Sequence, residues 1–300
     1  LKVKFYQIDF SRSIFDLKNH FESYKQILEL TNKNKYNFIH CHTPIASVIT
    51  RLVCKKSRIK CIYTAHGFHF YKGAPLINWM IFYPIEKYLS KYTDILITIN
   101  KEDFTLAKSK FCASKVYKVP GVGIDTKKYI ECNVDKDSYR KKLGINISDF
   151  VIISVGELSE RKNHSTIIKA ISKLDNSNIK YLIAGIGNKK KDLEDLICKL
   201  HLEEKVFLLG FRSDIPELCH CADIYAFPSK REGLGLAAIE GMASGLPLLS
   251  SNINGINDYS INGKTGFSYP PEDYIGFSKG IEYFFKNPIR RHEIGNININ

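Results

Sequence analysis

The chain has 300 residues, of which 44% are apolar, and its formal net charge is +13 at pH 7. That length suits one large domain or two ordinary ones, and the apolar content allows a sizeable core. No run of about 18 apolar residues occurs, and the first residues lack a secretory pattern, which argues against a spanning helix and a cleaved signal. The positive charge suits a nucleotide, a nucleic acid or a membrane surface, although a basic surface that serves only solubility explains it equally well.

The first part of the chain alternates short apolar runs, typical of strands, with stretches that carry apolar residues at helical spacing. Strands are predicted at 3–8, 37–41, 60–65, 94–99 and 115–119, and helices at 16–33, 46–55, 76–91 and 101–110. This alternation favours a parallel sheet with covering helices. A Pro-Gly-Val-Gly sequence from Pro120 then breaks the pattern, and polar residues follow to position 149. We therefore predict two domains, 1–126 and 127–300.

The same alternation resumes at position 150. Strands are predicted at 150–155, 179–184, 205–209, 223–226 and 247–250, and helices at 163–174, 188–200, 214–220, 235–244 and 273–285. The tail 296–300 has the composition of a frayed or truncated end. Two parallel-sheet domains in series leave a cleft between them, and such folds bind ligands at the carboxyl ends of their strands. The residues that follow strands are therefore the candidates for function.

The eight cysteines are predicted to be reduced thiols. None forms a C-x-x-C pair, and disulfide frameworks belong to short secreted chains, so a cytosolic protein is expected. His40-Cys41-His42 and Cys219-His220-Cys221 lack the spacing of zinc ligands, and no metal site is predicted at either.

The segment from Glu232 to Glu240 follows a predicted strand and carries the clearest chemistry. Gly233 and Gly235 sit at the start of a predicted helix, where backbone N–H groups favour an anion and glycines let a phosphate approach closely. Glu240 lies four residues beyond Leu236 on the same helix face, where a carboxylate can accept hydrogen bonds from a ribose diol. Glu232 precedes the helix and is placed to hold sugar hydroxyls. The arrangement suits a sugar nucleotide, although an ordinary strand-turn-helix with surface glutamates fits as well.

Glu232-x7-Glu240, followed by Gly-Met-Ala-Ser-Gly-Leu-Pro, resembles the E-x7-E signature of retaining glycosyltransferase family 4. The resemblance covers nearly the whole chain and is most specific when its motifs are taken jointly. Further matching motifs are Val155-Gly-Glu-Leu-Ser-Glu-Arg-Lys-Asn-His164, Ala184-Gly185-Ile-Gly187, Leu209-Gly-Phe211 and Tyr63-Thr-Ala-His66-Gly-Phe-His-Phe-Tyr-Lys-Gly-Ala-Pro75. The last resembles the histidine loop of capsular and exopolysaccharide members. The family implies the α/β GT-B fold, with two Rossmann-like parallel-sheet domains facing across a cleft.

The resemblance also implies residue roles. Lys162, at a helix start, is expected to neutralise a leaving diphosphate, and Arg161 adds a second cation because Glu157 stands where family members commonly carry Arg. His66, after a strand, is expected to hydrogen-bond the donor sugar. The catalytic set is thus His66, Lys162 and Glu232. Donor binding is assigned to Arg161, Gly185, Gly187, Phe211, Gly233, Leu234, Gly235, Leu236 and Glu240.

For two further histidines a structural role is favoured. His42, after the predicted strand 37–41, is a cleft candidate for which helix capping is the favoured role, and His69 is expected to serve the fold. Two motifs are set aside. Asp135-Lys136-Asp137 matches a D-x-D metal motif but lies in the polar linker, and Gly185-Ile186-Gly187 lacks the third glycine of a dinucleotide fingerprint. Cationic side chains and helix-start amides can replace a metal, so no metal and no cofactor are expected.

The predicted helix 76–91 is apolar on more than one face. It is expected either to be buried against neighbours or to dip into a membrane interface, helped by Arg51, Lys55, Lys56, Arg58 and Lys60. Peripheral contact with the inner face of the plasma membrane would suit a lipid-linked acceptor.

The resulting hypothesis is a glycosyltransferase that moves a sugar from a nucleoside diphosphate sugar, with UDP expected, to a glycan or undecaprenyl-diphosphate-linked acceptor. The N-terminal domain would bind acceptor and the C-terminal domain donor. The resemblance implies that a first strand and a glycine-rich loop precede the equivalent of Val3, and that a chain without them is inactive. Two alternatives stay open at this point: a UDP-sugar 2-epimerase of similar fold, and a non-catalytic nucleotide-sugar binding fragment.

Overall fold

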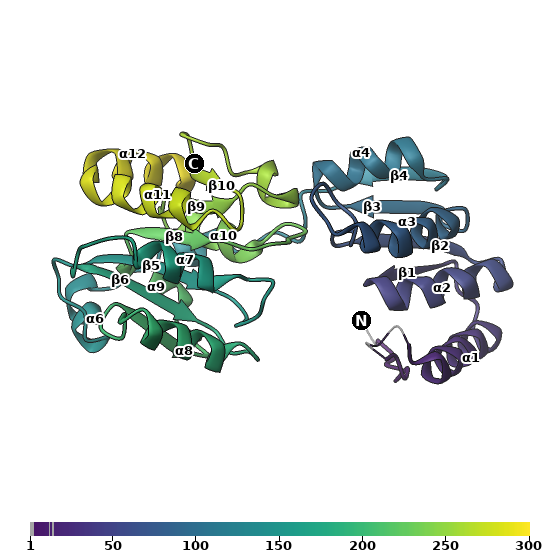
Figure 1. Cartoon of the computed structure of the whole chain (residues 1–300). Coiled ribbons are helices and arrows are strands. Elements are labelled where there is room, and N and C mark those ends of the chain that lie inside the picture. Colours follow the sequence, from purple (N-terminus) through teal and green to yellow (C-terminus); the bar gives the residue numbers. More distant parts are fainter. Residues whose placement is uncertain (1–2, 12, 14) are drawn as a thin grey trace. The chain divides into compact units, whose positions relative to one another are not determined.

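The computed structural model describes residues 3–11, 13 and 15–300, and it divides the chain into two compact units (Figure 1). Unit 1 comprises Leu1–Gly121 and unit 2 comprises Val122–Asn300. Each unit is built on its own parallel sheet with helices packed against it. The predicted parallel α/β class is therefore confirmed for both units.

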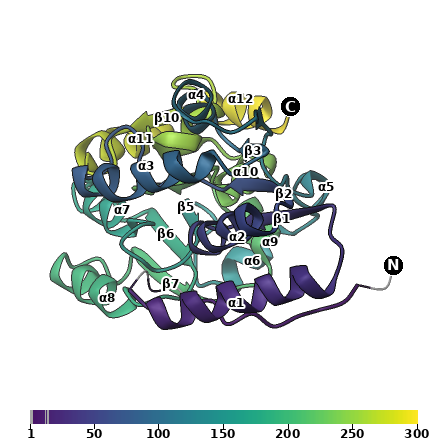
Figure 2. The same cartoon turned by 90° about the vertical axis from the view of Figure 1, so that its right-hand side faces the viewer.

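Unit 1 contains a four-stranded parallel sheet whose strands lie in chain order. The strands are β1 (Phe38–His42), β2 (Lys60–Ala65), β3 (Ile95–Thr98) and β4 (Lys115–Lys118), and the helices are α1 (Leu17–Lys33), α2 (Pro44–Ser57), α3 (Leu76–Ser90) and α4 (Lys101–Lys110). Helix α1 begins where its sequence predicts, because the Asp16 side chain accepts a hydrogen bond from the Asn19 amide and caps the first turn. Helices α1 and α2 pack side by side (Figure 2).

Two predictions for unit 1 are corrected. Residues 3–8 do not form a strand, since β1 pairs only with β2 and the side chains of Val3 and Phe5 are exposed. A strand exists only where a neighbour completes its ladder of hydrogen bonds, and the apolar pattern does not supply that neighbour. Arg51 is not a surface cation. It is buried, and its guanidinium donates to the Glu86 carboxylate of α3 at 2.8 Å.

Unit 2 contains a six-stranded parallel sheet in the order β10-β9-β8-β5-β6-β7. Its strands are β5 (Phe150–Val155), β6 (Ile179–Ala184), β7 (Val206–Gly210), β8 (Ile224–Phe227), β9 (Leu248–Ser251) and β10 (Gly266–Tyr269). Its helices are α5 (Thr126–Ile130), α6 (Lys136–Lys142), α7 (His164–Ile171), α8 (Lys190–Lys199), α9 (Ile215–Cys221), α10 (Leu236–Ala243), the 3₁₀ helix η1 (Asn254–Asp258), α11 (Tyr274–Lys286) and α12 (Pro288–Ile299).

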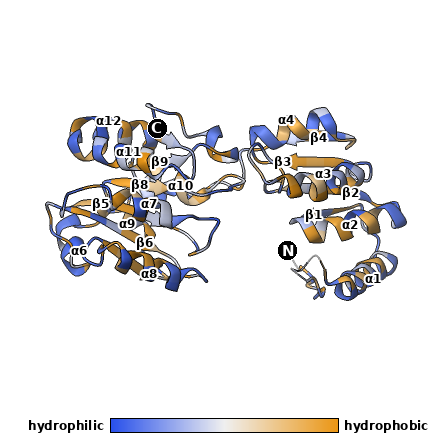
Figure 3. Ribbon diagram, viewed as in Figure 1, coloured by the Kyte–Doolittle hydropathy of each residue, from blue (hydrophilic) through white to orange (hydrophobic). Residues whose placement is uncertain are grey.

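The sheet of unit 2 separates two apolar cores. Ile152, Tyr181 and Phe277 belong to one core, and Ile153, Leu182 and Tyr225 to the other. Successive residues of a strand point to opposite faces, so strands covered on both faces read as continuous apolar runs. Figure 3 shows these strands as largely hydrophobic, whereas the helices carry both hydrophobic and hydrophilic residues. For this reason the predicted bounds of strands β5 and β6 agree with the observed ones.

The C-terminal tail is helical, contrary to the prediction of a frayed end. Helix α12 extends to Ile299, and the Asn298 amide donates to the carbonyls of Leu246 and Thr265 at 2.8 and 2.9 Å. These bonds tie the helix to the residues that precede β9 and β10. Strand β10, helices α5 and α6, and η1 were not predicted. The cysteines are all free thiols, as predicted.

Candidate active site

The strand order of unit 2 has a switch point between β5 and β8. From β5 the chain proceeds to β6 and β7 on one side, and from β8 it proceeds to β9 and β10 on the other. The loops that leave the carboxyl ends of these two neighbouring strands therefore diverge, which is where open parallel sheets bind ligands. Lys162 follows β5 and Glu232 follows β8, so two predicted site residues lie at this switch point.

Two cations converge on one carboxylate there. The Lys162 ammonium is 2.7 Å and the Arg161 guanidinium 2.8 Å from the same Oε1 of Glu232. The Glu232 side chain is only 9% exposed and that of Lys162 only 11% exposed. Buried charges persist when they are paired, so each cation fixes the position of the carboxylate and the carboxylate fixes theirs. The three side chains together carry one net positive charge.

Burial also sets the electrostatics of Lys162. Its pKa is lowered, first because desolvation penalises the ammonium, although the Glu232 carboxylate opposes this shift. The ammonium lies 4.7 Å from the centroid of the Phe227 ring, a cation–π contact. Gly156 makes room for the side chain, because a Cβ there would lie 3.1 Å from Cε of Lys162. The ammonium is thus held by its surroundings on several sides.

The loops after β5 and β8 are bound to each other. The amide of Lys230 donates to the carbonyl of Arg161 at 2.8 Å, and the Lys230 ammonium pairs with Glu160. The Asn163 side chain donates to the carbonyl of Pro228 at 3.0 Å. Asn163 itself has a left-handed backbone with φ of 57°, a conformation that asparagine tolerates better than most residues. These links align the cations with Glu232.

Gly185 and Gly187 have a packing reason to be glycine. A Cβ on Gly185 would lie 1.9 Å from the carbonyl oxygen of Gly156, and one on Gly187 would lie 2.2 Å from that of Leu158. The loop after β6 therefore packs directly on the loop after β5. Any larger residue would push the Lys162 loop out of place.

Helix α10 begins at Leu236, directly after Gly235. Its N-cap, Gly235, has φ of 85° and offers no capping side chain, so the first amides of the helix are not capped by it. A Cβ at Gly235 would lie 2.7 Å from Phe227 Cε1 and 2.9 Å from the Tyr259 hydroxyl. Position 235 therefore requires glycine, because its backbone is left-handed and because Phe227 and Tyr259 leave no room for a Cβ. Leu234 is buried beneath this turn, Leu236 is half-buried, and Gly233 packs against Gly255.

Glu240 lies further along α10 and is partnered by a residue that the sequence did not single out. Helices α5 and α10 are in contact, and the pKa of Tyr129 is raised, first by burial and then by the negative charge of the nearby Glu240 carboxylate. Tyr129 belongs to α5, in the polar segment interpreted as a linker. The one sequence feature that could have singled out Tyr129 is that it is an aromatic residue in a stretch otherwise rich in lysine.

Phe211 lies one strand further out than Gly185, after the edge strand β7, and its side chain is 77% exposed. Ile186, between the two glycines, is also exposed. These residues give the carboxyl edge of β6 and β7 an apolar surface of the kind on which a planar ring can lie.

In unit 1 the structure joins His66 to His42. His66 follows β2 and is exposed, and its Nε2 lies 2.9 Å from Nδ1 of His42, at the end of β1. The pKa of His66 is lowered, first by partial desolvation and then by His42. The interpretation of His42 as a helix cap is wrong, because Thr43 is the N-cap of α2. Within the described ranges, no group of three or more His, Cys, Asp or Glu side chains is arranged to hold a metal ion.

Comparison with known proteins assigns the chain to a family. Residues 135–300 match the model of glycosyl transferases group 1, and residues 1–100 match the glycosyl transferase 4-like model. The chain belongs to the glycosyl transferases group 1 family. It is 35% identical to the glycosyltransferase EpsD of Bacillus subtilis over 97% of this chain and 78% of that protein. An Escherichia coli enzyme named UDP-Gal:alpha-D-GlcNAc-diphosphoundecaprenol alpha-1,3-galactosyltransferase is 29% identical over 88% of this chain and 69% of the enzyme.

Solved structures of glycosyltransferases share the fold. HepE of Anabaena, determined in complex with UDP-glucose, superposes with a TM-score of 0.81 at 21% identity over 93% of this chain and 76% of that one. Sucrose-phosphate synthase from Thermosynechococcus elongatus gives a TM-score of 0.79 at 19% identity over 94% of this chain and 73% of that one. The predicted GT-B fold class is confirmed, and the chain is a glycosyltransferase.

Proposed function

We propose that this glycosyltransferase moves a sugar from a UDP-linked donor to a lipid-linked acceptor in cell-surface polysaccharide assembly, with retention at the anomeric carbon. The observation that carries the proposal is the cluster of Lys162, Arg161 and Glu232 at the switch point of the unit 2 sheet. Two cations are held there next to a helix start, and this arrangement suits a diphosphate.

In the proposed donor site, each part of the donor contacts a different set of residues around that cluster. The diphosphate lies against Lys162, Arg161 and the first amides of α10. Glu240 accepts hydrogen bonds from the ribose diol, and the Tyr129 hydroxyl lies near its carboxylate. The base lies on the apolar edge that Phe211 provides. A diphosphate would compete with Glu232 for the cations, which would release this carboxylate to accept bonds from the sugar hydroxyls.

The proposed mechanism uses only groups of the protein and its substrates. The acceptor hydroxyl attacks the anomeric carbon on the face from which the diphosphate leaves, and the departing diphosphate oxygen takes the acceptor's proton. Lys162 and Arg161 stabilise the charge that develops on that oxygen, which is the step at which preorganised charges lower the barrier most. His66 hydrogen-bonds the transferred sugar, and His42 holds the ring of His66. Because cations of the chain serve the diphosphate, we propose that no metal is needed.

The names of two relatives support the choice of donor and acceptor. The E. coli enzyme is named for transfer from UDP-galactose to a diphosphoundecaprenol-linked sugar. HepE of Anabaena has been crystallised with UDP and with UDP-glucose. A UDP-linked donor and a lipid-linked acceptor are therefore the pair to test first.

The exposed face of α3 supports a proposed membrane contact. Ile77, Met80, Ile81, Ile85 and Tyr88 recur at helical spacing and are all exposed. Lys55 and Lys91 each lie 5.9 Å from the ring centroid of Tyr88, at one end of this stripe. An apolar face beside cations suits the interface of an anionic bilayer, and we propose peripheral contact there. No helix in the described part of the chain has the length and apolarity to cross a bilayer.

The proposal is tested by incubating the chain with a panel of UDP-sugars and undecaprenyl-diphosphate-linked sugars. Transfer with an anomeric configuration that matches the donor, measured by NMR of the product, is the expected result, and EDTA should not abolish it. Inverted product or abolition by EDTA would contradict the mechanism. Donor consumption without acceptor would instead indicate an epimerase, and UDP binding without turnover a non-catalytic module.

A further inference from the structure

Unit 1 contains a cavity of about 920 Å³ that lies along helix α2. Helix α1 forms one wall with Phe21, and helix α3 forms another with Phe82 and Ile85. Ile45, Val48 and Leu52 of α2 lie between them, on the face opposite the buried Ser47, Arg51 and Cys54. We call this cavity the α2 groove. It is separate from the Lys162–Glu232 cluster, which belongs to unit 2.

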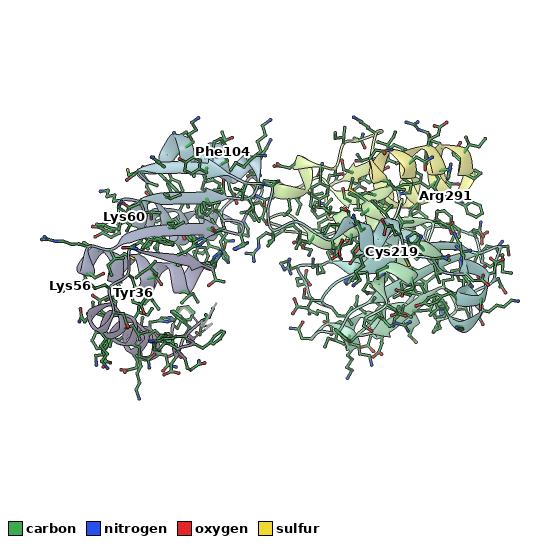
Figure 4. All side chains as sticks on the ribbon, turned by 180° about the vertical axis from the view of Figure 1, so that it is seen from behind. Tyr36, Lys56, Lys60, Phe104, Cys219 and Arg291 are labelled. Atoms are coloured by element: carbon green, nitrogen blue, oxygen red, sulfur yellow. The ribbon has the colours of Figure 1, made fainter. Side chains whose placement is uncertain are left out.

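The α2 groove is apolar along its length and cationic at one end. Among the described residues that line it, Glu86 is the only acidic one, and its carboxylate is bonded to the buried Arg51. Lys55, Lys56 and Arg58 line the end at the C-terminus of α2, and all are exposed. Figure 4 labels Lys56 and Lys60, which lie at that end of the unit. An amphiphile with an apolar chain fits this lining, because burial of its apolar surface stabilises the complex.

The opposite end of the α2 groove lies next to the histidine pair. Pro44 follows His42 by two residues, Gly67 directly follows His66, and both Pro44 and Gly67 line the groove. This end is at the carboxyl edge of the sheet, where His66 is placed, whereas Lys55 and Lys56 are at the amino edge. The 14 residues of α2 span about 21 Å, so the groove has the length for several isoprene units.

We propose that the α2 groove binds the apolar chain of a polyprenyl-type lipid acceptor. The sugar end of the acceptor reaches the histidine pair, and the chain leaves the groove where Lys55, Lys56 and Arg58 face the anionic headgroups of a bilayer. This proposal rests on the proposed function and extends it, since it names the feature of the acceptor that unit 1 recognises.

Binding is measured without turnover by titrating the full chain with farnesyl diphosphate. Trp79, the only tryptophan of the chain, packs 5.5 Å from the ring of Phe70, which lines the groove, so its fluorescence reports occupancy. We expect a saturable change with farnesyl diphosphate and none with inorganic diphosphate. An equal response to both probes, or no response to farnesyl diphosphate, would overturn the proposal.

Two exposed isoleucines of α3 provide a matched pair of variants. Ile85 lines the groove and is 41% exposed, whereas Ile77 is 56% exposed and is not among the lining residues. Ile85→Glu should weaken farnesyl diphosphate binding at least tenfold, and Ile77→Glu should change it less than twofold. Phe21→Glu, on the other wall, should behave like Ile85→Glu, so that the result does not depend on one variant's folding. Unchanged binding in both groove variants would refute the assignment.

Vesicles of phosphatidylglycerol without polyprenyl lipid distinguish a chain-binding groove from a membrane-inserting surface. Lys55→Glu/Lys56→Glu and Ile77→Glu should reduce vesicle binding, while Ile85→Glu should reduce it less than Ile77→Glu does. If Ile85→Glu abolishes vesicle binding and leaves the response to farnesyl diphosphate unchanged, the groove belongs to the membrane face and the proposal fails. If farnesyl diphosphate binds but no sugar is transferred, the groove stands and the proposed function fails.

Discussion

In unit 2 Lys162 and Glu232, at the carboxyl edge of the sheet, are largely buried and ion-paired, whereas in unit 1 the histidines at the corresponding edge are joined by one hydrogen bond and His66 is exposed. Unit 2 also packs its loops together through Gly185 and Gly187, while unit 1 exposes apolar side chains along α1 and α3. Side chains that are already held in place need little rearrangement when a ligand of fixed charge binds. We infer that unit 2 is built for one invariant group, the diphosphate, and unit 1 for a more variable acceptor.

The largest effect is expected at Lys162. Lys162→Met removes a preorganised cation and leaves Glu232 paired with Arg161 alone, so transfer should fall about 100-fold or more, as for the loss of one charge-stabilising donor. The measurement is kcat/KM with a UDP-sugar. Lys169→Met, on the outer part of α7, is the control. Equal rates in the two variants would remove Lys162 from the active site.

A second prediction concerns pH and the stability of unit 2. Burial, and then the charge of Lys162, lower the pKa of His164 to about 4. The folded state therefore binds fewer protons than the unfolded state between pH 6.5 and 4, and stability falls as pH drops through that window by about 3 kcal/mol. Urea unfolding followed by circular dichroism at several pH values should show this loss. His164→Gln should reduce the pH dependence, and an unchanged slope would mean that His164 is not its source.

Glu240→Ala is expected to cost about tenfold in kcat/KM, or about 1.4 kcal/mol, because the carboxylate would no longer bond the ribose diol. A 2′-deoxyribose donor should reduce the rate of the wild-type enzyme similarly and should not reduce that of the variant further, since one interaction cannot be lost twice. Tyr129→Phe, which removes only a hydroxyl near Glu240, should have a smaller effect. Additive losses would place the ribose elsewhere.

The smallest effect is expected in unit 1. His42→Leu removes the hydrogen bond that orients His66 and the like charge that helps to lower its pKa. The pKa of His66, followed by NMR titration, should therefore rise, and transfer should fall by a few fold. His42→Gln, which can still hydrogen-bond His66, should retain more activity than His42→Leu. A loss as large as that at Lys162 would show that the histidine pair is as preorganised as the cation cluster.

Local sequence predicted most elements because their signals are local. Strands 150–155 and 179–184 are largely apolar runs between turns, and α1 begins after a capping Asp16. The failures lie where formation depends on partners distant in the chain. Residues 3–8 have a strand pattern without a paired neighbour, and α12 is fixed by bonds of Asn298 to carbonyls 52 and 33 residues away.

The candidate site divides in the same way. By itself the sequence determined that cations, glycines and glutamates follow strands, and that these residue types suit a phosphate and a diol. Only the tertiary structure decided that Glu232 pairs with Lys162 across 70 residues, that Tyr129 reaches Glu240, and that His42 holds His66. The reason is that strand order is set by packing of the whole sheet. The placement of β8 beside β5 is encoded in no local pattern, yet it brings the two halves of the site together.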